Sequence, residues 1–411
     1  MVRQGSSSSS RHRLALVLVA GGLIALVGFG IRSIYGLFVE PLALAHGYSR
    51  ETLGLAIALQ NLLWGAAQPL AGGLADRFGP ARVLSGGGIV YAAGVALTAV
   101  ADTPLLLHLA AGVLVGLGLA GASFAVVIAT TSRLLPPASR ARAAGFVTAA
   151  GSLGQFVMAP LGQSLIQEFG YRTALYLLAV FPAVVPFLAL ALAGADSPPP
   201  AKISAAAPSL SRALVAALRH PSYLLVVLGF FVCGFHVAFI AAHLPAHCSA
   251  IGIDPWTAAW ALGLIGLFNI AGSWASGELS GRIPRRLLLS AIYGARAVAI
   301  VLFLLLPPSS GLVLAFTAAI GILWFSTVPP TSALVAAMFG TRYLGTLFGI
   351  VFFGHQLGAF LGVWLGGAVF DRLGTYEPVW WAGVGLALFA ALVHLPIGER
   401  PAPGFAREAA A

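Results

Sequence analysis

The sequence predicts an all-α, polytopic membrane protein with twelve transmembrane helices in two pseudo-symmetric six-helix bundles. Hydrophobic residues make up 59% of the 411 residues and charged residues only 8%, whereas soluble domains carry about 25% charged residues. Apolar stretches of about 20 residues recur along nearly the whole chain, and each is long enough to cross a bilayer as a helix. A pattern of glycines is also shared between the two halves.

The apolar stretches form two sets of six spans. The first bundle, residues 14–195, is expected to hold spans at roughly 14–38, 52–75, 83–101, 105–132, 143–166 and 174–194. The second bundle, residues 221–398, is expected to hold spans at roughly 222–245, 256–278, 287–306, 311–336, 345–370 and 379–397. The polar, serine-rich residues 1–13 predict a disordered tail, and residues 399–411 predict a second tail. Residues 196–220, which contain three consecutive prolines, predict the linker between the bundles.

The two halves repeat at a nearly constant offset. Gly28-Phe29 returns as Gly234-Phe235 after 206 residues. Four glycines return after 204 residues, as the pairs Gly145/Gly349, Gly154/Gly358, Gly162/Gly366 and Gly170/Gly374. Parallel half-repeats in a twelve-span protein are typical of transporters that bind substrate between two bundles, near the midplane of the membrane. The repeat therefore predicts a transporter.

Basic residues predict how the chain is oriented in the membrane. With the N-terminus inside, seventeen of the 22 Lys and Arg residues fall in inside segments, and three, Arg50, Arg172 and Arg372, fall outside. This excess predicts that both termini are cytoplasmic and that the protein lies in the cell inner (plasma) membrane. It also explains the net charge of +10 without nucleic acid as a partner.

The loop after span 2 carries a motif. It reads Gly72-Gly73-Leu74-Ala75-Asp76-Arg77-Phe78-Gly79-Pro80-Ala81-Arg82 and resembles the signature loop of the major facilitator superfamily; the alternative is a merely basic cytoplasmic loop. The resemblance implies that Asp76 caps the positive N-terminus of span 11 near Gly345. The expected gating residues are Gly73, Asp76, Arg77, Gly79 and Arg82. The corresponding loop of the second half has Gly281 in place of the aspartate, so we expect a weaker gate there.

Two segments resemble the monocarboxylate transporters and the related oxalate–formate antiporters. They are Gly28–Phe38 in span 1 and Arg140–Gly154 at the start of span 5. The resemblance implies a small organic anion as substrate, with a monocarboxylate favoured. That group carries an Asp and an Arg one turn apart in span 8, where this chain has Asn269 and Ser273. Its oxalate–formate members use a span-8 arginine and a span-11 lysine, which this chain also lacks. Symport, uniport and exchange therefore stay open.

Two arginines, Arg32 and Arg296, lie in apolar stretches, and no acidic residue lies deep in any such stretch. A charge at bilayer depth costs roughly 2.5–3.5 kcal/mol on insertion scales, so an anionic substrate is a natural partner. Arg32 lies on span 1, which the resemblance implies faces the cavity, although snorkelling to the interface is the alternative. Tyr35 can share its helix face or lie at the interface. Arg296 lies on span 9, which the resemblance implies is a peripheral helix, and is expected either to contact substrate or to bond polar groups of spans 8 and 10.

Uncharged polar residues near mid-depth complete the candidate substrate site. They are Gln60, Asn61, Gln155, Asn269, His355 and Gln356. Amides can replace the water around a carboxylate, while hydrogen bonds between helices are the plain alternative. His355 is the first candidate to carry a coupling proton and His236 the second, because the ordinary pKa of histidine lies near the working pH. The alternative for His355 is a neutral ring bonded to a neighbour.

Other chemistries find little support. His243 and His247 have the spacing of zinc ligands on a helix, but Pro245 and the nearby helix end spoil that geometry, so no metal is expected. Nucleotide-binding loops, paired carboxylates and nucleophile elbows are missing, so we expect no cofactor and no enzymatic activity. The expected partners are a small carboxylate and the lipid bilayer, with the chain a monomer. Two alternatives remain: a drug/proton antiporter of the same fold, disfavoured by the missing buried acid, and a membrane sensor without transport.

Overall fold

The computed structural model describes residues 5–134, 137–193 and 209–405, and over these ranges every regular element is a helix. The first half contains α1 (Gly5–Ser33), η1 (Tyr35–Phe38), α2 (Val39–His46), α3 (Arg50–Phe78), α4 (Pro80–Thr98), α5 (Pro104–Leu107), η2 (His108–Leu114), α6 (Val115–Gly121), α7 (Phe124–Leu134), α8 (Pro137–Ala183) and α9 (Val185–Leu190). The second half contains α10 (Leu210–Arg219), α11 (Pro221–Ala250), α12 (Pro255–Leu279), α13 (Arg285–Leu305), α14 (Ser310–Leu323), α15 (Val328–Phe339), α16 (Leu344–Leu373) and α17 (Glu377–His394).

These helices confirm the predicted fold class. Ten segments of the described residues are long and apolar enough to cross a membrane. One of them, Ala143–Leu190, contains a break at Gly170, whose φ of 74° is open to glycine but strained for other residues, so it accounts for two of the predicted spans. The remaining predicted span is α3, which has 29 residues and is long enough to cross, but it is more polar than the others.

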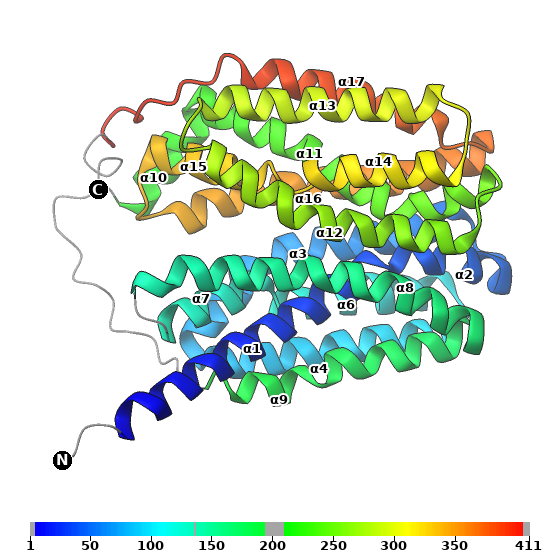
Figure 1. Cartoon of the computed structure of the whole chain (residues 1–411), viewed down its shortest axis with the longest axis horizontal. Helices are drawn as coiled ribbons and strands as arrows, with labels where there is room; N and C mark the ends of the chain where they lie inside the picture. Colours follow the sequence, from blue (N-terminus) through cyan, green and yellow to red (C-terminus); the bar gives the residue numbers. More distant parts are fainter. Residues whose placement is uncertain (1–4, 135–136, 194–208, 406–411) are drawn as a thin grey trace.

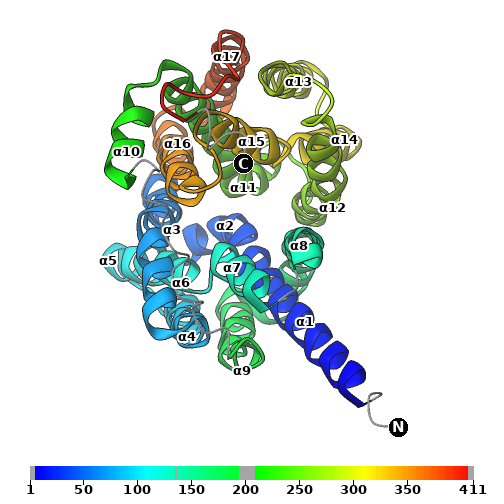
Figure 2. The ribbon, with the colours of Figure 1, turned by 90° about the vertical axis from the view of Figure 1, so that its left-hand side faces the viewer.

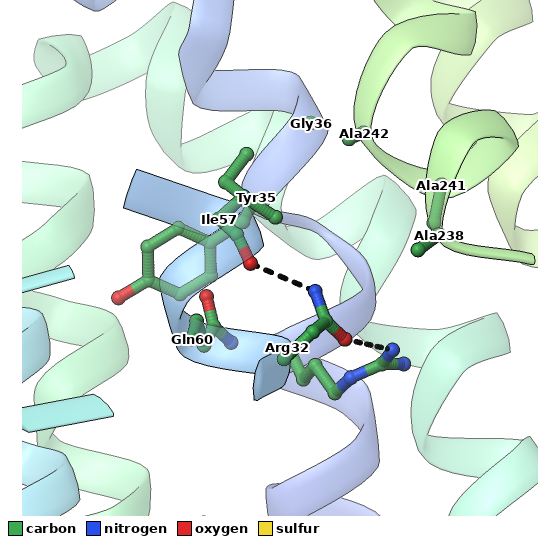
Figure 3. Close-up of a pocket in the computed structure, with 9 residues that line it drawn as sticks. Arg32, Tyr35, Gly36, Ile57, Gln60, Ala238, Ala241 and Ala242 are labelled. Carbon is green, nitrogen blue, oxygen red and sulfur yellow. Dashed lines mark hydrogen bonds between the residues drawn. The ribbon is translucent and has the colours of Figure 1, made fainter. Parts of the chain in front are cut away.

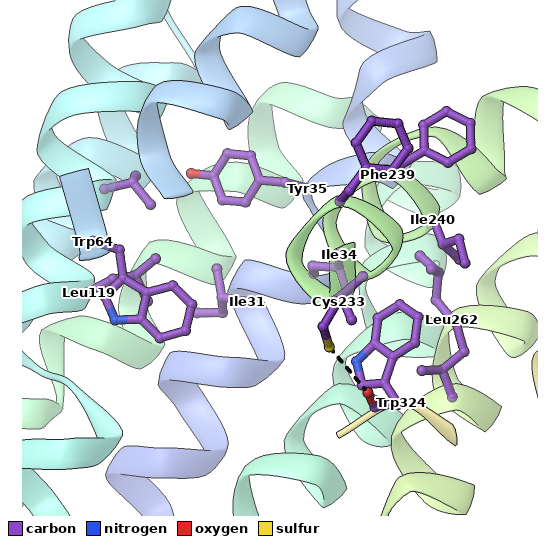
Figure 4. Close-up of a cluster of buried hydrophobic side chains, with 14 of the residues drawn as sticks. Ile31, Ile34, Tyr35, Trp64, Leu119, Cys233, Phe239, Ile240, Leu262 and Trp324 are labelled. Atoms are coloured by element: carbon purple, nitrogen blue, oxygen red, sulfur yellow. Dashed lines mark hydrogen bonds between the residues drawn. The ribbon is translucent and has the colours of Figure 1, made fainter. Parts of the chain in front are cut away.

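The two halves form separate groups of roughly parallel helices. Figure 1 shows the first half, from blue to green, below the second half, from green to red, with the start of α1 and the end of the described chain on the same side. Viewed along the helices, α3 faces α16 and α8 faces α12 across the boundary (Figure 2). An apolar core continues through both halves, and Figure 4 shows Ile31, Trp64 and Leu119 on one side of it and Phe239, Leu262 and Trp324 on the other.

Glycines allow the halves to touch along part of their length. A methyl group on Gly36 would collide with the carbonyl oxygens of Ala241 and Ala242, and one on Gly367 would collide with the carbonyl of Arg50. These contacts lie at the end of the bundle away from the chain termini, which we call the far end. At the other end, the termini end, a methyl on Gly73 or on Gly345 would have nothing within 4 Å. The halves are therefore closed against each other at the far end.

Some boundaries differ from the prediction. The first helix begins at Gly5, inside the expected disordered tail, and α10 occupies part of the expected linker. The second expected tail begins packed, because Ala402 N–H donates to Met338 O and Phe405 packs on Phe339. Residues 1–4, 194–208, which include the first half of the expected linker, and 406–411, at the end of the second tail, lie outside the described residues.

Candidate substrate site between the two halves

A small pocket lies where α1, α3 and α11 meet, at the boundary of the two halves (Figure 3). Its lining residues are Arg32, Tyr35, Gly36, Ile57, Gln60, Asn61, Ala238, Ala241 and Ala242. Its cavity volume is about 10 Å³, which is room for about one water molecule. Four of the nine candidate substrate residues, Arg32, Tyr35, Gln60 and Asn61, are therefore brought together, and a ligand larger than water requires the halves to separate slightly.

Arg32 occupies the last turn of α1, which ends at Ser33. A cation is favourable there because the unpaired carbonyl groups at a helix C-terminus carry partial negative charge. Its Nη2 donates to Asn61 Oδ1 at 2.7 Å, and its guanidinium lies 4.8 Å from the centre of the Trp64 ring. Its Nε atom is buried and has no hydrogen-bond partner. Among the described residues no carboxylate pairs with Arg32, so the side chain keeps donor capacity for an anion.

The two amides of α3 that line the pocket have different hydrogen-bond partners. Asn61 donates from Nδ2 to the Ile57 carbonyl at 2.8 Å, which turns its oxygen toward Arg32. Gln60 is only 1% exposed, yet neither its oxygen nor its nitrogen has a hydrogen-bond partner. Leaving a buried polar group unpaired costs about 1–3 kcal/mol. A ligand that supplied both an acceptor and a donor would recover that free energy.

Tyr35 contributes its ring to the pocket, but its hydroxyl points away from Arg32 (Figure 3). The hydroxyl lies beside Thr98 of α4. The α-helix has already ended at Ser33 and η1 begins at Tyr35, so the one-turn relation to Arg32 that a continuous helix would give does not hold. Tyr35 is therefore placed to shape the pocket rather than to donate a hydrogen bond into it.

Arg296 does not line the pocket. It is 2% exposed, and its Nε and Nη2 atoms donate to the carbonyl of Leu323 at 3.2 and 2.6 Å. Nη2 also donates to the carbonyl of Trp324 at 2.5 Å. These carbonyls end α14, where span 10 breaks before α15, so the guanidinium neutralises a helix C-terminus inside the bundle. Of the two roles expected for Arg296, this geometry fits the bracing of span 10.

Gln155 and Asn269 join the halves through α8 and α12. Gln155 Nε2 donates to Leu262 O at 3.1 Å, and Asn269 Nδ2 donates to Ser152 Oγ at 2.9 Å. Asn269 Oδ1 accepts from Ser273 Oγ and from Phe325 N–H, each at 3.0 Å. Their donors are thus engaged in contacts between helices, and the structure does not bring either residue to the pocket.

The pair His355-Gln356 on α16 does not line the pocket but bonds to a residue that does. Gln356 Nε2 donates to the Asn61 carbonyl at 2.9 Å, and Gln356 Oε1 is 3.0 Å from His355 Nδ1. An amide oxygen only accepts, so this contact assigns the hydrogen to Nδ1. The Nε2 atom of His355 is buried and has no hydrogen-bond partner. The second candidate, His236, instead bonds Gly383 O on peripheral α17 at 2.8 Å.

The expected gating loop follows α3. Gly79 has a φ of 88°, a value that suits glycine, and it allows α4 to begin directly at Pro80. Arg82 Nη1 donates to Phe78 O at 3.3 Å, and Arg77 lies over the Phe78 ring. The N-cap residue of α16, Tyr343, provides no side-chain cap. Capping of α16 by Asp76 stays a prediction.

The far end carries contacts that the sequence did not reveal. Asp371, in the last turn of α16, accepts hydrogen bonds from the backbone N–H groups of Arg50 at 2.9 Å and Glu51 at 2.6 Å. Asp371 therefore caps the N-terminus of a helix in the other half. Trp364 Nε1 also donates to Glu51 Oε1 at 3.0 Å. The partners are more than 300 positions apart in the chain, and no local motif links them.

The histidines considered as zinc ligands are used otherwise. His243 Nε2 bonds the Val363 carbonyl at 2.7 Å, and His247 packs against Phe303 and Trp380. Within the described ranges no group of three or more His, Cys, Asp and Glu side chains is arranged to hold a metal ion.

Comparisons with known proteins agree with this architecture. The model of the Major Facilitator Superfamily matches residues 20–363. Monocarboxylate transporter 13 of Bos taurus is 28% identical over 358 residues, covering 85% of this chain and 80% of that protein. The oxalate:formate antiporter of Oxalobacter formigenes is 24% identical over 286 residues, covering 70% and 68%.

Solved structures show the same fold. The inward open conformation of the xylose transporter XylE from E. coli matches with a TM-score of 0.74 at 12% identity, covering 97% of this chain and 99% of that chain. The residues matched by the family model, 20–363, extend across both halves and include the residues that line the pocket. The chain therefore belongs to the Major Facilitator Superfamily and is a multi-pass membrane transporter, not an enzyme.

Proposed function

We propose that the protein carries a small organic anion, favoured to be a monocarboxylate, by alternating access. The observation that carries this proposal is Arg32, a half-buried cation that faces a pocket between the halves and pairs with no carboxylate among the described residues. Beside it, the unpaired amide of Gln60 supplies a further donor and acceptor. The names of the relatives, monocarboxylate transporters and an oxalate:formate antiporter, support the same substrate class.

In this proposal the carboxylate binds to Arg32. An oxygen of the anion takes the place of Asn61 Oδ1 or accepts from the unpaired Nε of Arg32, and the charge–charge attraction is strong because the site excludes water. Gln60 then bonds a second polar group of the substrate or its other carboxylate oxygen. The anion offsets the cost of burying the arginine, so binding is favoured when the pocket is closed around it.

Transport follows if the halves rock about the pocket. The basic residues predict that the termini lie on the cytoplasmic side of a bacterial inner membrane. The far end then faces outward, and the closed contacts there form the outer gate. Release of Asp371 from the start of α3 would open that gate. The Asp76 loop would then close the termini end. The transporter is proposed to act as a monomer, with both termini on the cytoplasmic side.

His355 is the proposed carrier of a coupled proton. Its Nδ1 is bonded to Gln356 and its Nε2 is unpaired, so Nε2 has a lone pair able to accept a proton. Gln356 bonds the backbone of Asn61, and Asn61 bonds Arg32. These hydrogen bonds would therefore couple protonation of His355 to α3 and Arg32, which form the anion site. Proton symport requires a proton to move with the anion, whereas uniport and exchange do not, so all three stay open.

A drug/proton antiporter of the same fold is the alternative. Such a protein needs an anionic group to hold a cation, but the acids at the far end already have partners. Glu40 pairs with Arg50, Asp371 accepts from the start of α3, and Glu51 accepts from Trp364 Nε1. The pocket itself presents a positive charge. A sensor without transport would not need a pocket between two mobile halves.

The test uses purified protein in liposomes. Uptake of labelled pyruvate or lactate is measured with and without an imposed pH gradient, and uptake of a labelled organic cation is measured in parallel. We expect saturable uptake of the carboxylate and none of the cation. Saturable uptake of the cation with no carboxylate uptake would refute the proposal. Carboxylate uptake at the same rate with and without the pH gradient would exclude proton coupling but not anion transport.

A further inference from the structure

The pocket has two chemically different sides. All its polar side chains belong to the first half, on α1, η1 and α3. The second half contributes only Ala238, Ala241 and Ala242, on one face of α11 (Figure 3). Their i, i+3 and i+4 spacing places the three side chains together. We call these three residues the alanine wall.

The wall is held at a fixed depth. Ala238 and Ala242 are each 2% exposed and belong to a small apolar cluster with Ala58, Ala359 and Val363. Gly36 lies so close to α11 that a methyl group on it would collide with the carbonyls of Ala241 and Ala242. The wall therefore cannot move closer to η1, and while the far end stays closed its side chains decide how much room remains in the pocket.

An anion in this pocket is held in one orientation. Its carboxylate is attracted to Arg32 in the first half, and its carbon chain points toward a surface of methyl groups. Alanine is the smallest side chain that still carries a methyl, so any larger apolar residue there would take up space beside the substrate. This asymmetry suits a molecule with one charged end and one short apolar end.

We propose that Ala238 and Ala242 set the maximum length of the carbon chain that the transporter accepts. The inference rests on the proposed function, because it assumes that an anion binds at Arg32. It differs from the general use of alanine in tight helix packing, which requires small residues but predicts no effect on substrate choice. Ala238 and Ala242 are thus specificity-determining residues, in addition to the polar groups that bind the carboxylate.

The experiment measures competition in liposomes. Unlabelled acetate, propionate, butyrate and hexanoate compete with labelled pyruvate, and the half-inhibitory concentration of each acid is determined for wild type, Ala238→Val and Ala242→Val. One methylene in an apolar pocket changes discrimination by about 10-fold or more. We therefore expect each valine variant to weaken inhibition by butyrate relative to acetate by about 10-fold. Ala246→Val is the matched control, since Ala246 lies on the same helix, is 3% exposed and does not line the pocket.

Glycine variants protect the test against misfolding. If a valine variant is lost during purification, Ala238→Gly and Ala242→Gly are measured instead, and they are expected to strengthen inhibition by butyrate and hexanoate. Folded variants whose butyrate-to-acetate ratio equals that of wild type and of Ala246→Val overturn the inference. Failure of the proposed function looks different: in that case wild type itself takes up no labelled pyruvate.

Discussion

Replacing Asp371 with alanine is expected to open the far end of the transporter. In the closed state its carboxylate accepts two backbone hydrogen bonds from the start of α3 in the other half. Separation of the halves breaks both bonds, so they stabilise only the closed arrangement. Alanine removes both acceptors and leaves the first N–H groups of α3 to water in either state. The equilibrium should therefore shift toward the state that is open at the far end.

The size of the shift can be worked from these contacts. A hydrogen bond to a charged group contributes about 1.5–3 kcal/mol when buried, but Asp371 is exposed and its bonds are weakened by solvent. Loss of a helix N-cap costs about 0.5–2 kcal/mol. We take about 1–2 kcal/mol for the pair, which changes the ratio of closed to open molecules by about 5–30-fold.

Cysteine labelling from the far side measures this ratio. Ile57 lines the pocket, and the native cysteines Cys233 and Cys248 are fully buried, so Ile57→Cys provides a reporter with little background. A membrane-impermeant maleimide added on the far side should label the reporter about 5–30 times faster when Asp371→Ala is also present, to the extent that opening limits the reaction.

The matched control is Asp254→Ala. Asp254 is also an exposed N-cap aspartate and accepts from Thr257 N–H at 2.9 Å, but it caps a helix of its own half. Its loss should weaken the start of α12 without opening the far end. The reasoning is refuted if Asp371→Ala labels no faster than wild type, or if Asp254→Ala accelerates labelling equally.

Three further predictions concern side chains in and behind the pocket. Gln60→Leu should raise the free energy of unfolding by about 1–3 kcal/mol, because it removes a buried unpaired amide. It should also weaken the competition of carboxylates with labelled pyruvate. A stabilised variant with unchanged affinity for carboxylates would exclude Gln60 from the site. Arg296→Gln should lower the melting temperature, because it removes the cation from the carbonyls of Leu323 and Trp324, while KM for the folded fraction stays near that of wild type; a large rise in KM would instead indicate substrate contact. His355→Ala should abolish the stimulation of uptake by an acidic outside medium, and unchanged stimulation would remove His355 from proton coupling.

Hydropathy and the spacing of the apolar stretches are sufficient to predict most of the fold. Each span is an apolar run whose length is set by the bilayer, so its approximate position follows from composition. Breaks inside spans were not predictable in the same way. Span 1 bends after Ser33 and span 10 breaks between Leu323 and Val328, because packing against the other helices satisfies backbone groups that an isolated helix would have to satisfy internally.

The residues that the first half contributes to the candidate site could also be proposed from the sequence. Arg32, Gln60 and Asn61 are polar residues in apolar spans, and such residues face the interior of a bundle. The second-half side was missed, since alanines carry no signal of their own among the many small residues of the chain. The sequence allowed two roles for Arg296, and its hydrogen bonds to the carbonyls of Leu323 and Trp324 favour the bracing of span 10. Asp371 was missed because its partners on α3 are distant in sequence.

Uptake of labelled pyruvate by Arg32→Gln in liposomes tests the central claim most directly. Glutamine keeps a hydrogen-bond donor and removes the charge, so it isolates the attraction between the guanidinium and the carboxylate. Arg282→Gln is the control, because the Arg282 side chain is 74% exposed and, among the described residues, its ion pair is with Glu278 one turn away. An anion site at Arg32 predicts that Arg32→Gln loses nearly all pyruvate uptake and Arg282→Gln keeps it. Uptake by folded Arg32→Gln at the wild-type rate would contradict the anion site.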